Sequence, residues 1–298
     1  MELRHLRYFD AVATERNFTK AAERIGVAQP PLSRQIRELE LEFGVTLIDR
    51  SSRPVELTDA GRIFHDQCVR ILASVEQLGA SIRHFRNGPG QVFMIGVVGS
   101  IMQSAMPAMI RKFRNQLPDV EVELVELTTV EQVGALKNGR IDAGLGRVRI
   151  NDPGVRREVL YEEPLIAALP AGHHLTAGGG AIKLQSLQQE TLILYPSQPR
   201  PSYADQVLGL FRDLGALPER VREVQEIQTA LGLVASQAGV AIVPLSMRNI
   251  QRADIAYVPI KDSNARSPII LSQRLSDESR AASLFRDIGR AEFMAAGD

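Results

Sequence analysis

The sequence is poor in cysteine and in long apolar runs. Cys68 is the only cysteine in 298 residues, which excludes an intramolecular disulfide and a thiolate-rich metal site and agrees with a reducing cytoplasm. Apolar stretches such as Leu165–Pro170 and Val240–Leu245 are far too short to cross a bilayer. Residues Met1–Asp10 carry charges where a signal peptide needs an apolar segment. We therefore expect a cytoplasmic chain that is neither exported nor attached to a membrane.

The sequence also lacks net charge. Its 35 basic residues balance 35 acidic ones, and within residues 1–58 nine Lys or Arg stand against nine Asp or Glu. The chain therefore has no net positive charge that would attract nucleic acid, and any DNA contact must depend on where individual charges lie. The length of 298 residues suggests about two domains of ordinary size.

The beginning of the chain has the pattern of a helix-turn-helix. Apolar residues at helical spacing predict a first helix near residues 3–15. A second helix is expected to begin at Thr19, a good N-cap, and to end at Gly26. Pro30-Pro31 can open a third helix, where the missing N–H groups cost nothing. Two short helices joined by a glycine-containing turn form a helix-turn-helix.

A ribbon and a long helix follow. Residues 45–48 and 54–57 predict two short strands, and the tip between them, residues 49–53, would be the wing. Thr58 is the expected N-cap of a helix over residues 59–86. The apolar residues of this helix fall at heptad a and d positions: Phe64, Cys68, Ile71, Val75, Leu78, Ile82 and Phe85. We favour a dimerisation helix over packing within one chain, because a helix on a single core shows a wider apolar face.

Beyond Asn87-Gly88-Pro89-Gly90, which predicts a hinge, strands alternate with helices. The expected strands are 92–98, 120–126, 143–145, 164–169, 192–194, 221–224, 240–243, 255–258 and 269–272. The expected helices are 101–114, 129–138, 202–213, 227–237 and 277–295. This alternation predicts an α/β fold with parallel sheets covered on both faces.

Several motifs near the N-terminus resemble the DNA-binding head of LysR-type transcriptional regulators. They are Asn17–Ala22, Ala28–Ile36, Gly44–Arg50 and Leu57–Gly61. The resemblance implies an N-terminal winged helix-turn-helix, a long linker helix and a two-lobed effector domain like a periplasmic binding protein. The implied boundaries are head 1–58, linker helix 59–86, hinge 87–91 and effector domain 92–298, with lobe I about 92–162 and 266–298 and lobe II about 163–265.

A narrower resemblance is to the CatR/BenM-like, muconate-responsive subgroup. It rests on Met1–Phe9, Gly96–Ser100, Ala135–Asp142, Leu194–Pro196 and Pro201–Tyr203. It implies an activator of catechol or benzoate catabolism genes that responds to cis,cis-muconate. The implied partners are double-stranded promoter DNA, RNA polymerase and further copies of the chain, as a homodimer assembling to a homotetramer. No cofactor is expected.

The third helix carries the expected base-reading residues on its solvent face. These are Gln29, Pro30, Ser33, Arg34 and Arg37. Residues at the start of a recognition helix meet base edges in the major groove, where Gln29 suits adenine and Arg34 suits guanine. Ser33 and Arg37 are equally suited to phosphates. Acidic residues follow only after this patch. An ordinary solvated helix face is the alternative interpretation.

The predicted wing carries two arginines. Arg50 and Arg53 flank a pair of serines, and arginine on a narrow ribbon suits a minor groove or its phosphates. Arg53 is the stronger candidate. The alternative for Arg50 is an internal ion pair with Asp49 or with an acid of the long helix.

Three predicted helix starts in the effector domain carry hydroxyl groups. Gly99-Ser100 and Thr128-Thr129 each follow a strand, and Pro201-Ser202-Tyr203 begins a helix of lobe II. Helix N-termini at the carboxyl ends of strands bind anions through free N–H groups. Opposed hydroxyl-lined termini suit a small dicarboxylate, and the resemblance implies effector contact at Gly99, Ser100, Thr129, Pro201, Ser202 and Tyr203. Arg147 adds a positive charge or forms a structural ion pair. Ordinary helix capping is the alternative.

Catalysis and metal binding are not supported. The sequence has no GxxxxGK followed by Ser or Thr, no GxGxxG after a strand and no GxSxG elbow. Its only close histidine pair, His173-His174, is adjacent in a glycine-rich loop, where alternating ring directions suit chelation poorly. We therefore expect no enzyme and no metal site. Two alternatives stay open: a regulator that responds to a different small organic acid, and a DNA-binding regulator with no small-molecule effector.

Overall fold

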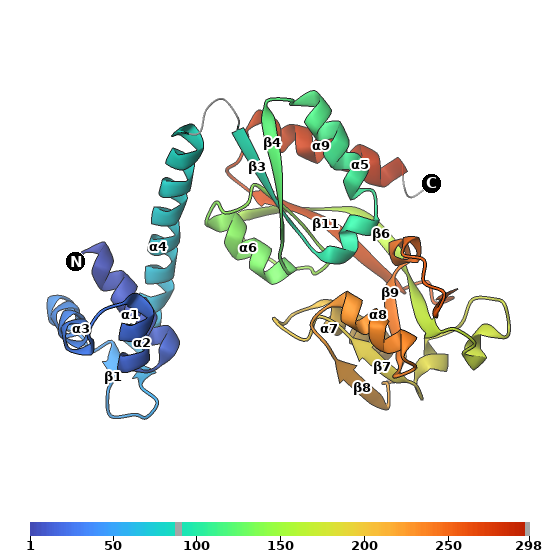
Figure 1. Cartoon of the computed structure of the whole chain (residues 1–298), viewed down its shortest axis with the longest axis horizontal. Coiled ribbons are helices and arrows are strands. Elements are labelled where there is room, and N and C mark those ends of the chain that lie inside the picture. The colour runs from blue at the N-terminus through green and yellow to red at the C-terminus, as the bar shows by residue number, and fades with distance from the viewer. Residues whose placement is uncertain (87–90, 296–298) are drawn as a thin grey trace. The chain divides into compact units, whose positions relative to one another are not determined.

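The computed structural model describes residues 1–86 and 91–295, apart from several side chains in the second half of the long helix (Figure 1). The chain divides into two compact units, Met1–Arg86 and Asn87–Asp298, which are described separately below. The hinge predicted at 87–91 lies almost entirely outside the described residues. Within the described residues, no helix combines the length and the apolar character needed to cross a membrane.

The first unit is a three-helix head with a two-stranded ribbon and a long helix. Its elements are α1 (Leu3–Glu15), α2 (Phe18–Ile25), α3 (Gln29–Phe43), β1 (Ile48–Asp49), β2 (Glu56–Leu57) and α4 (Asp59–Arg86). The predicted N-cap of α2 was wrong. Asn17 Oδ1 accepts hydrogen bonds from the backbone N–H groups of Thr19 and Lys20, at 2.9 and 3.2 Å, so the helix begins one residue before Thr19. Gly26 ends it with φ +77°, as the turn requires.

The core of the head includes the beginning of α4. Cys68 is buried in the apolar core of the head, with its Sγ 3.2 Å from the carbonyl oxygen of Leu6, and the Phe64 ring meets Phe9 edge-on with centroids 4.9 Å apart. These two positions of the predicted dimer seam therefore pack within their own chain. Farther along, Ile71 and Leu78 are 41% and 64% exposed, so the seam is free of intrachain cover there. Ile82 and Phe85 lie among the side chains that the structure does not describe.

The second unit contains the remaining elements. Its strands are β3 (Gln91–Val97), β4 (Val120–Glu126), β5 (Ala143–Gly146), β6 (Val155–Pro170), β7 (Thr191–Leu194), β8 (Arg220–Glu223), β9 (Val240–Pro244), β10 (Ile255–Pro259) and β11 (Arg266–Arg274). Its helices are α5 (Met106–Gln116), α6 (Thr129–Lys137), α7 (Tyr203–Asp213), α8 (Ile227–Ala235) and α9 (Arg280–Ala295), with 3₁₀ turns η1 (Gly99–Gln103), η2 (His174–Thr176), η3 (Leu184–Leu187) and η4 (Leu245–Asn249). The helix predicted at 101–114 is thus divided between η1 and α5.

The sheet of this unit is mixed, which corrects the prediction of parallel sheets. The strand order is β4-β3-β5-β11-β6-β9-β7-β8, with β10 also paired to β6. β3 is parallel to β4 and β5, whereas β11 is antiparallel to both β5 and β6. The first part of β6 pairs with β11, and its second part pairs with β9 and β10. One strand therefore runs through both lobes, each of which has its own apolar core.

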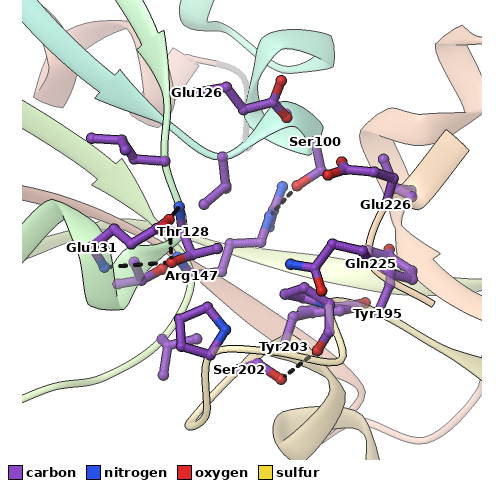
Figure 2. Close-up of a pocket in the computed structure, with 18 of the residues that line it drawn as sticks. Ser100, Glu126, Thr128, Glu131, Arg147, Tyr195, Ser202, Tyr203, Gln225 and Glu226 are labelled. Atoms are coloured by element: carbon purple, nitrogen blue, oxygen red, sulfur yellow. Dashed lines mark hydrogen bonds between the residues drawn. The ribbon is translucent and has the colours of Figure 1, made fainter. Parts of the chain in front are cut away.

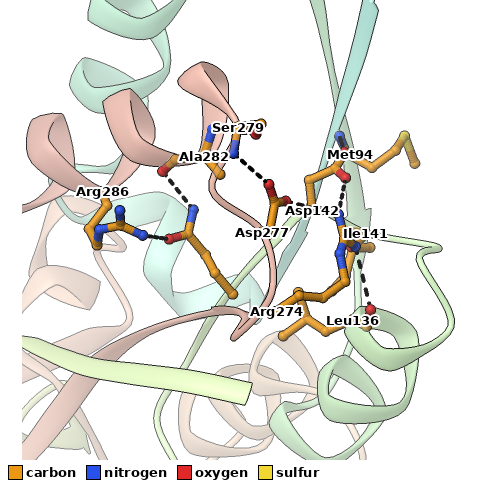
Figure 3. A network of polar contacts seen from close by, with 10 residues as sticks. Met94, Leu136, Ile141, Asp142, Arg274, Asp277, Ser279, Ala282 and Arg286 are labelled. Atoms are coloured by element: carbon orange, nitrogen blue, oxygen red, sulfur yellow. Dashed lines mark hydrogen bonds and ion pairs between the residues drawn. The ribbon is translucent and has the colours of Figure 1, made fainter. Parts of the chain in front are cut away.

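A polar network closes lobe I at the end of β11 (Figure 3). Arg274 donates to the carbonyl oxygen of Ile141 at 2.6 Å and pairs with Asp142 at 2.8 Å and Asp277 at 3.0 Å. Asp142 in turn accepts from the backbone N–H of Met94 in β3. A strand late in the sequence is thereby fixed to the start of β5 and to β3.

Candidate functional site

The recognition surface lies on α3. Gln29 is the first residue of this helix, and its early prolines are accommodated at positions where no hydrogen bond is lost. The predicted DNA-facing residues Gln29, Pro30, Arg34 and Arg37 are exposed, and Ser33 is half-buried. Arg34 is 73% exposed and lies 3.7 Å from Glu38 one turn later, an ion pair that water weakens strongly. The face is therefore available to a duplex.

Arg50 is paired within the head, although about a third of its side chain stays exposed. Its Nη2 atom donates to Glu40 Oε2 at 2.7 Å, and its guanidinium lies 5.7 Å from the centre of the Phe18 ring. The partner is an acid of the recognition helix; neither Asp49 nor an acid of α4 takes this role. Arg50 thus has an internal ion-pair partner, as the alternative interpretation expected, and its contact with DNA stays a prediction.

The wing tip is organised by Asp49. Its carboxylate accepts from the backbone N–H and hydroxyl of Ser51, at 2.9 and 2.6 Å, and from the hydroxyl of Ser52 at 3.2 Å. Hydrogen bonds from Ser51 are the main reason why the pKa of Asp49 is lowered. The two serines thus point into the tip. Arg53 is exposed and, within the described part of the chain, has no ion-pair partner, so it is the free cation of the wing.

The second site is a cavity of about 300 Å³ in the second unit (Figure 2). It is formed where β3, β4, β5, β7 and β8 end and where η1, α6, α7 and α8 begin. All seven predicted effector residues line it: Gly99, Ser100, Thr129, Arg147, Pro201, Ser202 and Tyr203. Its volume is at the lower end of the range for small-molecule sites, which suits a compact ligand.

Arg147 is the buried cation of the cavity wall. Its side chain is 3% exposed, and its Nη2 atom donates to Glu163 Oε2 at 2.6 Å. Its Nε atom donates to Ser100 Oγ at 2.9 Å, and Glu163 Oε1 accepts from the backbone N–H of Ser246 at 2.6 Å. The chain Ser100–Arg147–Glu163–Ser246 therefore joins η1 of lobe I to η4 of lobe II. Among the described residues, Arg147 Nη1 is buried without a partner.

The three predicted hydroxyl groups differ in whether their protons are still available to a ligand. Ser100 and Thr129 accept hydrogen bonds from Arg147, through its Nε and its backbone N–H respectively, so each keeps its own proton for a ligand. Ser202 donates its proton to the carbonyl oxygen of Pro196 at 2.9 Å. Thr128, not Thr129, caps α6 and exchanges hydrogen bonds with Glu131. Ser100 and Thr129 are thus the free donors.

Two tyrosines form the lobe II side of the cavity. The rings of Tyr195 and Tyr203 lie with centroids 5.2 Å apart. Burial raises the pKa of both phenols above the ordinary value, so both stay protonated at neutral pH. Tyr203 donates to the carbonyl oxygen of Ile242 at 3.3 Å, whereas Tyr195 Oη has no partner among the described residues.

Sequence reasoning missed the acidic rim. The cavity is also lined by Glu126, Glu131, Tyr195, Gln225 and Glu226. Gln225 and Glu226 lie between β8 and α8, the same strand-to-helix position that identified Ser100 and Thr129. The signal was therefore present but was applied only to hydroxyl residues. The exposed carboxylates make the mouth of the cavity negative, while the buried Arg147 and hydroxyls lie deeper.

The histidine pair is arranged differently from the prediction. The rings of His173 and His174 lie side by side, 4.3 Å apart, and their Nε2 atoms are 3.5 and 3.8 Å from Glu190 Oε1. The argument from alternating ring directions was therefore wrong. His173 Nδ1 accepts from the backbone N–H of Leu175, which places the proton of the neutral ring on Nε2, facing Glu190. Together with Glu190, the two imidazoles lie close enough to hold a metal ion, so the expectation of no metal site stays a prediction.

The comparisons with known proteins agree with this architecture. The lysR-family model of bacterial regulatory helix-turn-helix proteins matches residues 3–62, and the LysR substrate binding domain model matches residues 86–294. The chain is 46% identical to the probable cat1 operon transcriptional activator of Acinetobacter lwoffii, over 97% of this chain and 95% of that protein. It is 47% identical to the transcriptional regulator CatR of Pseudomonas putida, over 94% and 95%.

Two solved structures cover the two sites. Full-length CbnR complexed with its target DNA is 33% identical, with a TM-score of 0.68, over 98% of this chain and 100% of that one. The BenM effector-binding domain with its effector benzoate is 38% identical, with a TM-score of 0.65, over 70% and 94%. A winged helix-turn-helix followed by a two-lobed sensor defines a DNA-binding transcriptional regulator, not an enzyme. The chain belongs to the LysR family, among activators related to the cat and ben regulators.

Proposed function

We propose that the chain activates genes of catechol- or benzoate-type aromatic catabolism in response to cis,cis-muconate. The observation that carries this proposal is the cavity, where two free hydroxyl donors, Ser100 and Thr129, lie beside the buried cation Arg147. Helix N-termini and hydroxyl donors favour an anion, and the small volume favours a compact one. The high identity to the cat1 operon activator and to CatR supports the same assignment.

The regulator is proposed to act as a dimer of dimers on promoter DNA, with RNA polymerase as a further partner. The exposed Ile71 and Leu78 of α4 support the dimer, because they are the seam positions that the chain itself leaves open. A dimer presents two recognition helices, so its target is a pseudo-palindrome. Footprinting at a divergent promoter, with and without muconate, tests the proposed regulatory role.

Effector binding is tested by calorimetry with muconate. Ser100→Ala removes a free donor and is expected to weaken binding about ten- to hundredfold, since a hydrogen bond to a charged group contributes roughly 1.5–3 kcal/mol. Ser236→Ala is the control, because this exposed serine lies outside the cavity and donates its proton to the carbonyl oxygen of Leu233. Equal affinities of the wild type and Ser100→Ala would count against the site.

Two other functions predict different results. A regulator of another small organic acid would show a thermal shift with that acid and none with muconate. A regulator without an effector would show no shift with any acid, since only binding to the folded state raises stability. A screen of mono- and dicarboxylates, with benzoate included because BenM binds it, separates these cases.

A further inference from the structure

Arg50 and Glu40 connect three parts of the head that are separate in the sequence. Glu40 belongs to α3, Arg50 follows β1, and Phe18 begins α2. Glu40 Oε2 binds the guanidinium, while its Oε1 accepts from the backbone N–H groups of Leu47 and Ile48 at 2.9 and 3.1 Å. We propose that Glu40 and Arg50 are positioning residues that fix the wing relative to the recognition helix, and that Arg53 makes the wing's contact with DNA.

The ribbon needs such support because its own ladder is short. β1 and β2 pair through only two residue pairs, Ile48 with Leu57 and Asp49 with Glu56. Two-stranded ribbons are marginally stable alone even when they are longer. Glu40 fixes the chain at both residues that enter β1, and the side chain of Glu40 is only 10% exposed. The carboxylate therefore determines the path into the wing.

The ion pair also determines which arginine is free. Arg50 is 32% exposed and faces Glu40 and Phe18. Moving it to a phosphate would leave the nearly buried Glu40 carboxylate with an uncompensated charge, which is costly. Arg53, three residues later, is exposed and follows the tip that Asp49 organises. A preorganised wing loses less entropy when it binds, so its orientation contributes to affinity without touching DNA.

The test uses the full-length chain and the duplex that the wild type selects from a randomised pool. The variants are Glu40→Gln, Arg50→Met, the double variant, and Arg53→Met as the matched control. If electrostatics alone mattered, Glu40→Gln would tighten binding, because it removes a negative charge near phosphates. The proposal predicts the opposite sign: a loss of roughly tenfold, in the range of coupling between residues in contact.

The double variant and the salt dependence complete the test. We expect the double variant to bind no more weakly than the weaker single variant, because both break one contact. Arg50→Met should leave the slope of log K against log salt unchanged. Arg53→Met should reduce it by about 0.9, the value for one phosphate contact.

Two results would overturn the proposal: unchanged or tighter binding by Glu40→Gln, or a reduced salt slope in Arg50→Met. Far-UV circular dichroism and the melting temperature establish that each head is folded. If Arg50→Met does not fold, Arg50→Lys replaces it. Lysine keeps the charge but loses the planar group over Phe18, so the proposal predicts weaker binding at an unchanged slope. Wild-type affinity of Arg50→Lys would instead identify Arg50 as a simple phosphate contact.

Discussion

Replacing Arg147 by methionine tests whether the cation in the cavity wall also holds the effector domain together. Methionine keeps the length of the side chain but leaves Glu163, 4% exposed, as a buried carboxylate without its cation. Removing one partner of a buried ion pair costs about 3–5 kcal/mol. In a unit of this size each kcal/mol lowers the melting temperature by about 2–4 °C, so we expect a fall of about 6–20 °C.

Tyrosine fluorescence is the assay, because the chain has no tryptophan and four of its five tyrosines lie in the second unit. Arg149→Met is the control. Arg149, two residues after Arg147, pairs with Glu162, the residue before Glu163. The two side chains are 63% and 40% exposed, so the loss should stay below about 1 kcal/mol.

A second substitution separates lost charge from lost packing. Glu163→Gln added to Arg147→Met removes the unpaired charge and keeps an oxygen that accepts from Ser246, so most of the stability should return. The reasoning is refuted if Arg147→Met loses no more stability than Arg149→Met, or if the double variant is as unstable as Arg147→Met alone.

Three further predictions concern single positions. A Cβ at Gly146 would lie 2.5 Å from Thr129 Oγ1, so Gly146→Ala should cost roughly 1–3 kcal/mol by denaturant titration and weaken effector binding by calorimetry; unaltered binding would contradict the role of Thr129. Burial raises the pKa of Cys68 to about 12, so a disulfide reagent at pH 8 should react only after denaturation. Rapid reaction of the native protein would disprove this. Glu126→Gln removes a rim charge and should tighten muconate binding roughly two- to threefold by calorimetry, with weaker binding as the contrary result.

The head was predicted well where the signals are local. Helical periodicity, the glycine at Gly26 and the prolines of α3 each act within one turn, and they located the helices to within about one residue. The error at Asn17 arose because two residues that cap helices well, Asn17 and Thr19, lie only two positions apart. The partner of Arg50 was not predictable in this way, because Glu40 is ten residues away and reaches it only through the folded turn between α3 and β1.

In the effector domain too, features that depend on neighbouring residues were predicted, and pairings between distant segments were not. The order of strands and helices placed Ser100 and Thr129 at one cavity, since strand ends of a sheet converge. The first part of β6 was missed because it carries charged residues, Arg156, Arg157 and Glu158, which hide a strand from hydropathy. The ion pair between Arg147 and Glu163 depends on the antiparallel pairing of β11 with β6. This pairing was not predicted, because the alternation of strands and helices had indicated parallel strands.

The continuity of β6 has a mechanical consequence for the sensor. The strand passes from one lobe to the other without a break, and it is bonded to β11 on one side of the crossing and to β9 and β10 on the other. Drawing the lobes together would therefore require β6 to bend, and a strand that is hydrogen-bonded to its neighbours is stiffer than a loop. If an effector draws the lobes together, part of its binding free energy would be stored as elastic strain in β6 and returned when the effector leaves.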